Sequence, residues 1–522
     1  MMDGLYSQGK NETRVMRLQL PICDRMVITE VSGEVSLPDY QPEIKRLLRV
    51  SATVQPPTRY VGGGSMEFSG AVDYCILYTG NDGQMYCFPT SADYTFRVPL
   101  EAGADFDLSD ALVCYAHSEP EAIISRVGGP RRMSIKCRLR SHVKAYGSCV
   151  IEEKRTGATG PWQEERLWRE VETTVSTYGI SAPFTLSDEI LLDESGEGDY
   201  RIISGDVQLL IHEAQCASGR VNCRGEAVLK LLVQKEGEKT EPMAMWRKLP
   251  IDRTIELDGA TAAGTAAAMG SCTELRLSME DGRVLCEAEI VLEARAARPE
   301  TISYTCDMYV ADRESACAKQ EYRLPRQMCR VNVNFTQNES RTLDELGLSP
   351  SSRVVDVYGT AHLENVASDR DRHVLSGKCR YTLVLMSDGE LGAKEIELPF
   401  RYILDGTATQ GVPFGWEGQA QLVSARARMD GERLGVDAEL GIWLCAMSEQ
   451  SACMVESMEV GEAISRTAGQ MLLCYPAADD TLWSVAKRYS VPIDRLEQNN
   501  RIGGERRADD SASLAGVHCL VI

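Results

Sequence analysis

Cysteine and histidine side chains stand at spacings that could support metal binding in the first third of the chain. Cys114 and His117 are three residues apart, Cys137 and His142 are five apart, and together they would offer four zinc ligands. On one strand, residues five apart point to opposite faces, which separates Cys137 from His142. Buried thiols and incidental histidines are the favoured interpretation, and we predict no metal and no cofactor.

Two other short motifs resemble catalytic or phosphate-binding signatures. Ser484 and Lys487 match a Ser-x-x-Lys nucleophile pattern, but its partner motifs are absent and we expect both side chains on the exposed side of a helix. The glycine run at 61–65 is followed neither by Gly-Lys-Ser/Thr nor by a helical pattern, so it indicates a connection between strands. No carboxylate pair stands out either, and we predict that the protein is not an enzyme.

Composition and charge limit the classes of partner. The chain has 522 residues, 43% of them hydrophobic and 25% charged, which is typical of an ordered protein of about three to five domains. Its formal charge is −21, without a cluster of Lys and Arg, which argues against nucleic acid and against an anionic membrane surface. The 18 cysteines are scattered through apolar strand patterns, so we expect buried free thiols rather than a disulfide scaffold.

Neither a membrane span nor a secretory signal is predicted. No apolar run approaches the roughly 18–20 residues that a membrane span needs, and the alanine-rich stretch 260–268 is short and interrupted. The first 14 residues are polar and lack the apolar core of a secretory signal. We therefore expect a cytoplasmic protein.

A repeat of about 150 residues dominates the chain. Three alternating strands begin at Gly70, Gly225 and Gly377, and each runs into a turn that contains a second glycine 12 or 13 residues further on. A second hairpin turn follows 42–46 residues later in each copy. These second turns are Gly128-Gly129, Asp281-Gly282 and Asp430-Gly431.

Short alternating strands between such turns predict a mainly β fold with antiparallel sheets. We predict three tandem β-sandwich or barrel-like modules at 15–152, 166–312 and 321–462. Segments at 151–165, 296–320 and 462–470 would link them, and the second of these includes a strand-like run at 302–310. In the first copy, Pro38 and Pro42 precede an expected amphipathic turn of helix with Ile44, Leu47 and Leu48 facing inward.

The last 50 residues follow a helical pattern instead. Thr481 is expected to cap a helix whose apolar stripe is formed by Leu482, Val485, Ala486 and Tyr489. Pro492 breaks this helix and opens a second one, in which Ile493 and Leu496 continue the buried face.

This segment resembles a LysM module, a small βααβ domain that binds N-acetylglucosamine-containing glycans and sometimes proteins. The resemblance implies a domain at 470–522 with strands at 472–475 and 517–522. The family's loop glycine is Asp479 here, and a polar insert occupies 503–513. The implied groove is lined by Asp479, Asp480, Thr481, Leu482 and Trp483 opposite Asn499, Asn500 and Ile502.

Trp483 has two interpretations, of which an anchor in the core is favoured over a ligand-contacting ring in this groove. The adjacent carboxylates of Asp479 and Asp480 favour a protein ligand over a glycan.

The segment 37–50 and the glycine-anchored strand after it resemble the SPOCS domain. Tandem SPOCS domains followed by one LysM module resemble the SipL-like family of spore-morphogenesis proteins. The resemblance implies a non-enzymatic scaffold on the mother-cell side of the forespore surface, in the spore coat. Its implied partner is a sporulation stage IV protein A-type ATPase. The alternative is a peptidoglycan-binding protein of the spore cortex or cell envelope.

Overall fold

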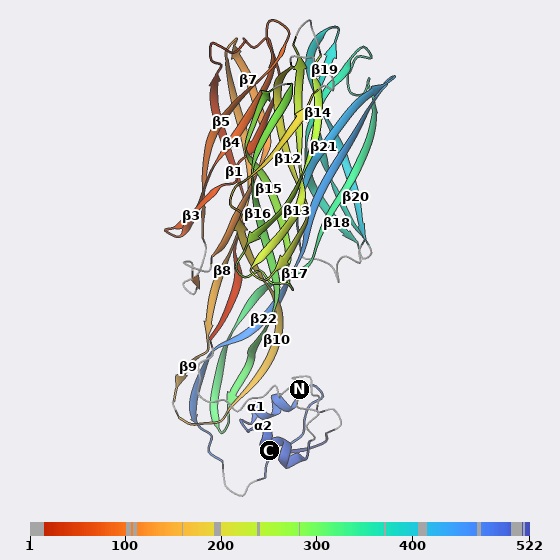
Figure 1. Cartoon of the computed structure of the whole chain (residues 1–522). Helices are drawn as coiled ribbons and strands as arrows, with labels where there is room; N and C mark the ends of the chain where they lie inside the picture. The colour runs from red at the N-terminus through yellow and green to blue at the C-terminus, as the bar shows by residue number, and fades with distance from the viewer. Residues whose placement is uncertain are drawn as a thin grey trace.

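The fold is mainly β, as predicted, with several antiparallel sheets and only two short helices among the described residues. It is seen in a computed structural model (Figure 1). The structure describes residues 15–100, 106–107, 112–158, 160–192, 200–236, 241–280, 282–369, 372–405, 415–466, 471–502, 514 and 517–522.

The first eight strands form two facing sheets of four strands each. One sheet has β8 beside β1, β6 and β7, and the other has β4 beside β2, β3 and β5. Their bounds are β1 Val15–Ser36, β2 Arg46–Val54, β3 Thr58–Gly62, β4 Ser65–Thr79, β5 Met85–Pro99, β6 Phe106–Asp107, β7 Val113–Gly129 and β8 Arg132–Glu152.

The next group of strands repeats this arrangement. Strand β16 pairs with β10, β11 and β15, and β13 lies between β12 and β14. Their bounds are β10 Glu164–Ile180, β11 Phe184–Leu191, β12 Tyr200–Ala217, β13 Arg220–Lys235, β14 Met243–Glu256, β15 Thr265–Glu280 and β16 Arg283–Val310.

The third group has the same order again. Strand β22 pairs with β17 and β21, and β19 lies between β18 and β20. Strand β9, Lys154–Gly157, also joins β22, in parallel. The other bounds are β17 Arg313–Thr342, β18 Arg353–Asp369, β19 Arg372–Ser387, β20 Glu390–Asp405, β21 Gly415–Asp430 and β22 Arg433–Ala463.

Four of the hairpin turns lie where the repeat predicts them. The turn expected at Gly128-Gly129 lies at Pro130-Arg131 instead, because β7 continues to Gly129, and the turn expected at Gly237 lies outside the described residues. Gly83 and Gly389 both have φ of 79° and separate β4 from β5 and β19 from β20. Gly282 and Gly431, with φ of 73° and 58°, begin the turns into β16 and β22. These left-handed backbone angles favour glycine, so the repeated glycines locate the hairpins.

The expected helical turn in residues 37–50 is wrong. Ile44 and Leu48 are buried as expected, but β2 begins at Arg46 and pairs with β4, with Arg46 opposite Thr79. Three apolar residues at helical spacing span only one turn, and the ladder with β4 satisfies the backbone groups instead.

The expected linker at 296–320 lies mostly within strands, because β16 and β17 together run from Arg283 to Thr342 with a two-residue turn between them. Six strand segments continue past the sandwiches as a narrow bundle, which we call the stalk (Figure 1). It comprises residues 15–20, 146–152, 164–171, 302–310, 313–325 and 449–463.

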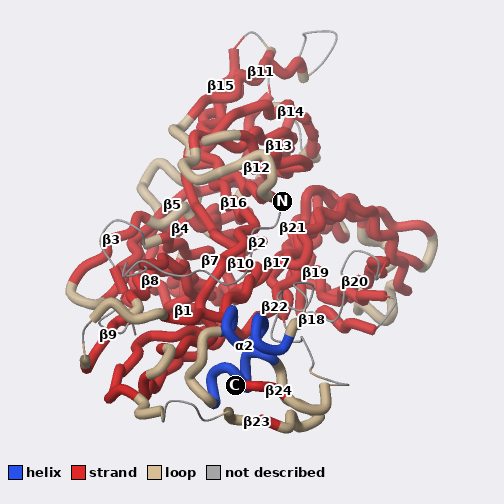
Figure 2. Tube along the Cα trace, turned by 90° about the horizontal axis from the view of Figure 1, so that it is seen from below, coloured by secondary structure: helices blue, strands red, loops and turns tan. Residues whose placement is uncertain are grey.

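Viewed from below, the three sandwiches surround a common axis (Figure 2). Leu77, Leu232 and Val384, each seven residues after the repeat glycine, meet in one buried apolar cluster. Leu48, Met85, Ile203, Tyr358 and Leu391 complete this cluster, so all three sandwiches contribute to it. The repeated glycine-anchored strands therefore build one body.

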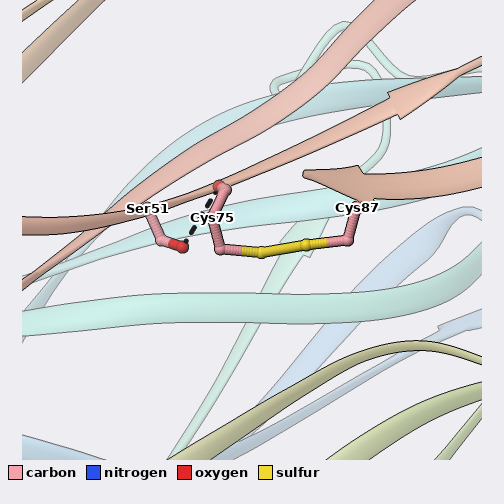
Figure 3. Close-up of a disulfide and its surroundings, with 3 residues drawn as sticks. All are labelled: Ser51, Cys75 and Cys87. Atoms are coloured by element: carbon pink, nitrogen blue, oxygen red, sulfur yellow. Dashed lines mark hydrogen bonds between the residues drawn. A yellow bond between two sulfur atoms is a disulfide. The ribbon is translucent and has the colours of Figure 1, made fainter. Parts of the chain in front are cut away.

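One pair of cysteines departs from the prediction of free thiols. Cys75 in β4 and Cys87 in β5 form a disulfide, and Ser51 of β2 lies beside it with Oγ 3.5 Å from the Cys75 carbonyl oxygen (Figure 3). The two strands pair directly, with Leu77 opposite Cys87, which brings the thiols close. None of the other 16 cysteines forms a disulfide, and most of them are buried as predicted.

The C-terminal module has the predicted order of strand, two helices and strand. It consists of β23 Leu473–Cys474, α1 Leu482–Arg488, α2 Ile493–Asn500 and β24 Leu520–Val521, and its two strands pair antiparallel. It lies at the end of the stalk (Figure 1). Neither helix in the described part of the chain has the length and apolar character needed to cross a membrane.

Candidate functional site

The predicted cap of α1 is present. The Thr481 side chain accepts a hydrogen bond from the Ser484 backbone N–H at 3.1 Å, and the Ser484 hydroxyl accepts one from the Thr481 N–H at 2.9 Å. This reciprocal pair satisfies two backbone donors that the first turn would otherwise leave unpaired. Ser484 is therefore occupied by helix capping, which is a structural role.

Asp480 is buried and shapes the loop before α1. Its Oδ2 accepts a hydrogen bond from the Ala477 backbone N–H at 2.9 Å and its Oδ1 accepts one from the Ser484 hydroxyl at 3.2 Å. Arg488 forms an ion pair with the same carboxylate, and its hydrogen bond is the main cause that lowers the pKa of Asp480. Asp480 is thus fully engaged within the module.

Trp483 faces the stalk. Its indole Nε1–H donates to Asp307 Oδ2 of β16 at 2.9 Å, and its ring meets Tyr309 edge-on with centroids 5.2 Å apart. Asp307 also receives hydrogen bonds or ion pairs from Lys487 at 2.5 Å and Lys319 at 3.0 Å. The expectation that Lys487 lies on an exposed helix face is wrong, because α1 turns this side toward the stalk.

Backbone contacts fix the turn between the two helices to the same surface. The Tyr309 hydroxyl donates to the Val491 carbonyl oxygen at 2.7 Å, and the Asp312 N–H donates to the Ser490 carbonyl oxygen at 2.7 Å. Arg466 pairs with Asp312 at 3.2 Å and donates to the Tyr489 carbonyl oxygen at 2.7 Å. The module is therefore held at several points.

The apolar interiors of the stalk and the C-terminal module are continuous. Residues from six stalk strands and from both helices belong to one buried cluster. Its stalk members include Leu18, Ile151, Leu167, Tyr309 and Met454, and its module members include Leu482, Trp483, Val485, Ile493 and Leu496.

A buried carboxyl group lies beneath the second helix. Glu165 of β10 accepts a hydrogen bond from the Ile493 N–H in the first turn of α2 and another from Gln163 Nε2 at 2.9 Å. Burial first, and then the carboxylates of Asp494 and Glu497, raise the pKa of Glu165 to about 7 against the effect of those hydrogen bonds. Glu165 therefore places a titratable group at the contact between β10 and α2.

On the other side of the predicted groove, two residues make contacts within the fold and one is exposed to solvent. Asn500 closes the module, because its Nδ2 donates to the Val521 carbonyl oxygen at 2.8 Å and its Oδ1 accepts from the Val521 N–H at 2.6 Å. Ile502 is half-buried and packs against the shared core. Asn499 is exposed.

The residues of the predicted groove therefore differ in burial, and not all of them are available to a ligand. Asp480, Leu482 and Trp483 are buried, whereas Asp479 and Asn499 are exposed and Thr481 is half-buried. The loop of Asp480 and the chain after the insert do meet, since the Leu514 N–H donates to the Asp480 carbonyl oxygen at 3.3 Å. The insert 503–513 lies outside the described residues.

Sequence reasoning missed an apolar surface beside these residues. Met471, Leu473 and Tyr475 expose 74, 46 and 74% of their surface, while Cys474 between them is buried. Leu472 exposes 49% as well, so exposure does not alternate along this segment, and only Leu473 and Cys474 pair with β24.

The candidate metal ligands do not gather. Cys114 and Cys137 are buried, and His117 of β7 lies opposite His142 of β8, which pairs with Asp24 at 2.6 Å. Within the described ranges, no group of three or more His, Cys, Asp or Glu side chains could hold a metal ion. The glycine run joins β3 to β4 as a tight connection, with positive φ at Gly63 and Gly64.

No protein-family model, curated protein or solved structure matches this chain.

Proposed function

We propose that this protein is a non-enzymatic scaffold or adaptor of spore coat or envelope assembly, which docks to a partner through its C-terminal module. The partner implied by the family resemblance is a stage IV protein A-type ATPase at the forespore surface. The observation that supports the proposal is the attachment of the module to the stalk. Trp483 makes this attachment through its hydrogen bond to Asp307 and its ring contact with Tyr309.

A fixed module supports an adaptor role for a thermodynamic reason. Docking of a loosely tethered domain must overcome the loss of its freedom to move, whereas a module held by a shared core has already lost that freedom on folding. Asp479, Asn499 and the side chains of Met471, Leu473 and Tyr475 remain exposed on it. Carboxylate, amide and apolar groups together suit a protein surface.

The test must change the exposed face of the C-terminal module without disturbing its contacts with the stalk. Deletion of 466–522 would uncover the apolar end of the stalk, and Trp483→Ala would remove a core ring, so neither isolates docking. Asp479→Lys and Asn499→Lys alter exposed groups only. Capture of the purified ATPase by the full chain should fall strongly in these variants.

Asp252→Lys is the matched control, because Asp252 lies on β14 with 75% of its side chain exposed and makes only a surface ion pair. It should capture the ATPase like the unmodified chain. Equal capture by all variants would contradict the proposal. Sedimentation with purified peptidoglycan that is lost in Asp479→Lys, without any capture of the ATPase, would favour the glycan-binding alternative.

A further inference from the structure

A cavity of about 570 Å³ lies between the first and second sandwiches, and we call it the lateral cavity. Pro56 and Pro57, which lie between β2 and β3, line it from the first sandwich, and Tyr178, Ile180 and Pro183 line it from the second. Ile180 and Pro183 are exposed and the other three are half-buried, so the cavity is open to solvent. Its size falls within the range of small-molecule sites, about 300–1,000 Å³.

Two arginines and two tyrosines form a stack that reaches this cavity. Tyr115 of β7 and Tyr178 of β10 stack with their ring centroids 5.4 Å apart. The Arg295 guanidinium lies 3.9 Å from the centre of the Tyr115 ring, and the Arg59 guanidinium lies 5.3 Å from the centre of the Tyr178 ring. Arg59, Tyr115 and Tyr178 line the cavity, whereas Arg295 does not. Arg59 is therefore the end of the stack on the side of the cavity.

The two arginines differ in their charge partners. Arg295 forms an ion pair with Glu417 at 3.1 Å. Arg59 is exposed, and no ion pair within the described ranges involves it. Its Nη1–H donates to the Cys114 carbonyl oxygen, which holds the guanidinium at the cavity. A guanidinium has five N–H donors, so one carbonyl oxygen leaves it able to bind a further acceptor.

The surroundings of the cavity do not neutralise this charge. Among the described residues that line the cavity, Arg59 is the only one with a charged side chain. The carboxyl group of Glu293 shares a hydrogen bond with Tyr178, and the charge that acts on it is that of Arg295. Burial raises the pKa of Glu293, which favours its uncharged form. The lateral cavity therefore combines a mainly apolar wall with one positive charge that has no counter-charge.

We propose that the lateral cavity binds an apolar monocarboxylate, a hydrocarbon skeleton that carries one carboxylate group. The carboxylate accepts hydrogen bonds from Arg59, because a planar guanidinium matches the geometry of a carboxylate. The skeleton lies against the exposed side chains of Ile180 and Pro183 and the ring of Tyr178. This site lies apart from the C-terminal module, so it adds a ligand to the proposed docking function.

Three probes separate the two parts of this recognition. Octanoate has both the chain and the charge, 1-octanol has the chain without the charge, and acetate has the charge without the chain. Each probe is titrated into the full chain by calorimetry, and contact is confirmed by saturation-transfer NMR. Octanoate should bind saturably and more tightly than either of the other two probes.

Two variants test the two parts in the protein. Arg59→Met should weaken octanoate binding about tenfold, the effect of a lost charge-assisted hydrogen bond, and leave 1-octanol binding unchanged. Ile180→Ser removes exposed apolar surface, so it should weaken the binding of both probes about fivefold. Both positions are exposed, and the fold should tolerate both substitutions. Thermal melting checks this, and either variant alone still tests one part of the site.

Arg253→Met is the matched control. Arg253 is also exposed, and its guanidinium also lies over an aromatic ring, 4.6 Å from the centre of Phe184, but neither residue lines the cavity. This variant should bind octanoate like the unmodified chain. Three results would overturn the proposal: no saturable binding of octanoate, binding of 1-octanol as tight as that of octanoate, or unchanged octanoate binding in Arg59→Met.

Discussion

Phe68 in the first sandwich stacks on Phe96 of the neighbouring strand of the same sheet, with ring centroids 5.3 Å apart. Trp483 in the C-terminal module has its ring partner, Tyr309, in a stalk strand instead. The first sandwich has an interior cluster built from its own strands, whereas the cluster of the module includes strands from all three sandwiches.

The difference follows from the amount of secondary structure. The C-terminal module has helices of seven and eight residues and two strands of two residues, among the described residues. Elements of this size bury little apolar surface on their own. Three long ladders supply the additional surface: β1 with β8, β10 with β16, and β17 with β22.

Among the variants that test this comparison, Trp483→Ala should have the largest effect on stability. Truncation of a buried aromatic ring costs about 3–5 kcal/mol, and it also removes one hydrogen-bond donor from Asp307. We expect the amides of α1 and α2 to lose protection in hydrogen-exchange mass spectrometry, while β4 and β5 keep theirs.

Phe68→Ala is the matched variant in the first sandwich. Its cost should be similar, but the loss of protection should lie in β4 and β5 and leave α1 unchanged. If Trp483→Ala leaves the helices as protected as before, the module is stable without the stalk and the comparison fails.

Asp307→Asn should have the next largest effect. It keeps the size of the side chain but removes the charge that Trp483, Lys487 and Lys319 share, at a cost of about 1.5–3 kcal/mol. Asp437→Asn, at an exposed pair with Arg428, should cost less than about 1 kcal/mol. Chemical denaturation of the two variants measures both values.

The pH dependence gives Asp307 a second test. Burial alone would raise its pKa, but the hydrogen bond from Lys487, followed by those from Trp483 and Lys319, holds it below the usual value. A lowered pKa stabilises the fold above the unfolded value of about 3.8, and this stability is lost as the pH falls through the folded pKa. In Asp307→Asn, the free energy of unfolding should no longer show this fall at acid pH. If the variant and the unmodified chain lose stability equally in acid, Asp307 is not the group responsible.

Local patterns could be predicted from the sequence. The turn glycines, the Thr481 cap and Pro492 at the start of α2 act through backbone angles and neighbouring N–H groups, so the residues themselves determine them. The mainly β fold followed from these signals.

Contacts between distant segments could not be predicted in the same way. Nothing near Trp483 in the sequence identifies Asp307 or Tyr309, and the covered face of α1 depends on where the stalk ends. The Cys75–Cys87 disulfide likewise depends on strand register. For the candidate groove, sequence alone therefore identified the loop residues but not which of them are buried.

Glu165→Gln should have a smaller effect on stability. The stability that Glu165 contributes is lost as the pH rises, whereas that of Asp307 is lost as the pH falls. The pKa of Glu165 is raised to about 7, first by burial, so the folded protein keeps a proton that the unfolded chain releases above its value of 4.5. Its contribution to stability is full below pH 4.5 and is lost as the pH rises to about 7.

After allowance for solvent screening we expect a change on the order of 1 kcal/mol between these limits. Hydrogen exchange of α2, corrected for intrinsic rates, should show weaker protection at pH 8 than at pH 5 in the unmodified chain and no such difference in Glu165→Gln. A profile that is equally steep in both would assign the effect to Asp494 or Glu497.

Asp479→Lys should have the smallest effect on stability, within about 0.5 kcal/mol, because Asp479 is exposed while its neighbour Asp480 accepts hydrogen bonds inside the loop. Asp480→Asn would weaken the pair with Arg488 and should destabilise α1 measurably. Melting curves of the two variants thus separate adjacent carboxylates that the sequence alone treats alike. If Asp479→Lys melts as early as Asp480→Asn, Asp479 supports the fold, and its loss of partner capture could no longer be assigned to docking.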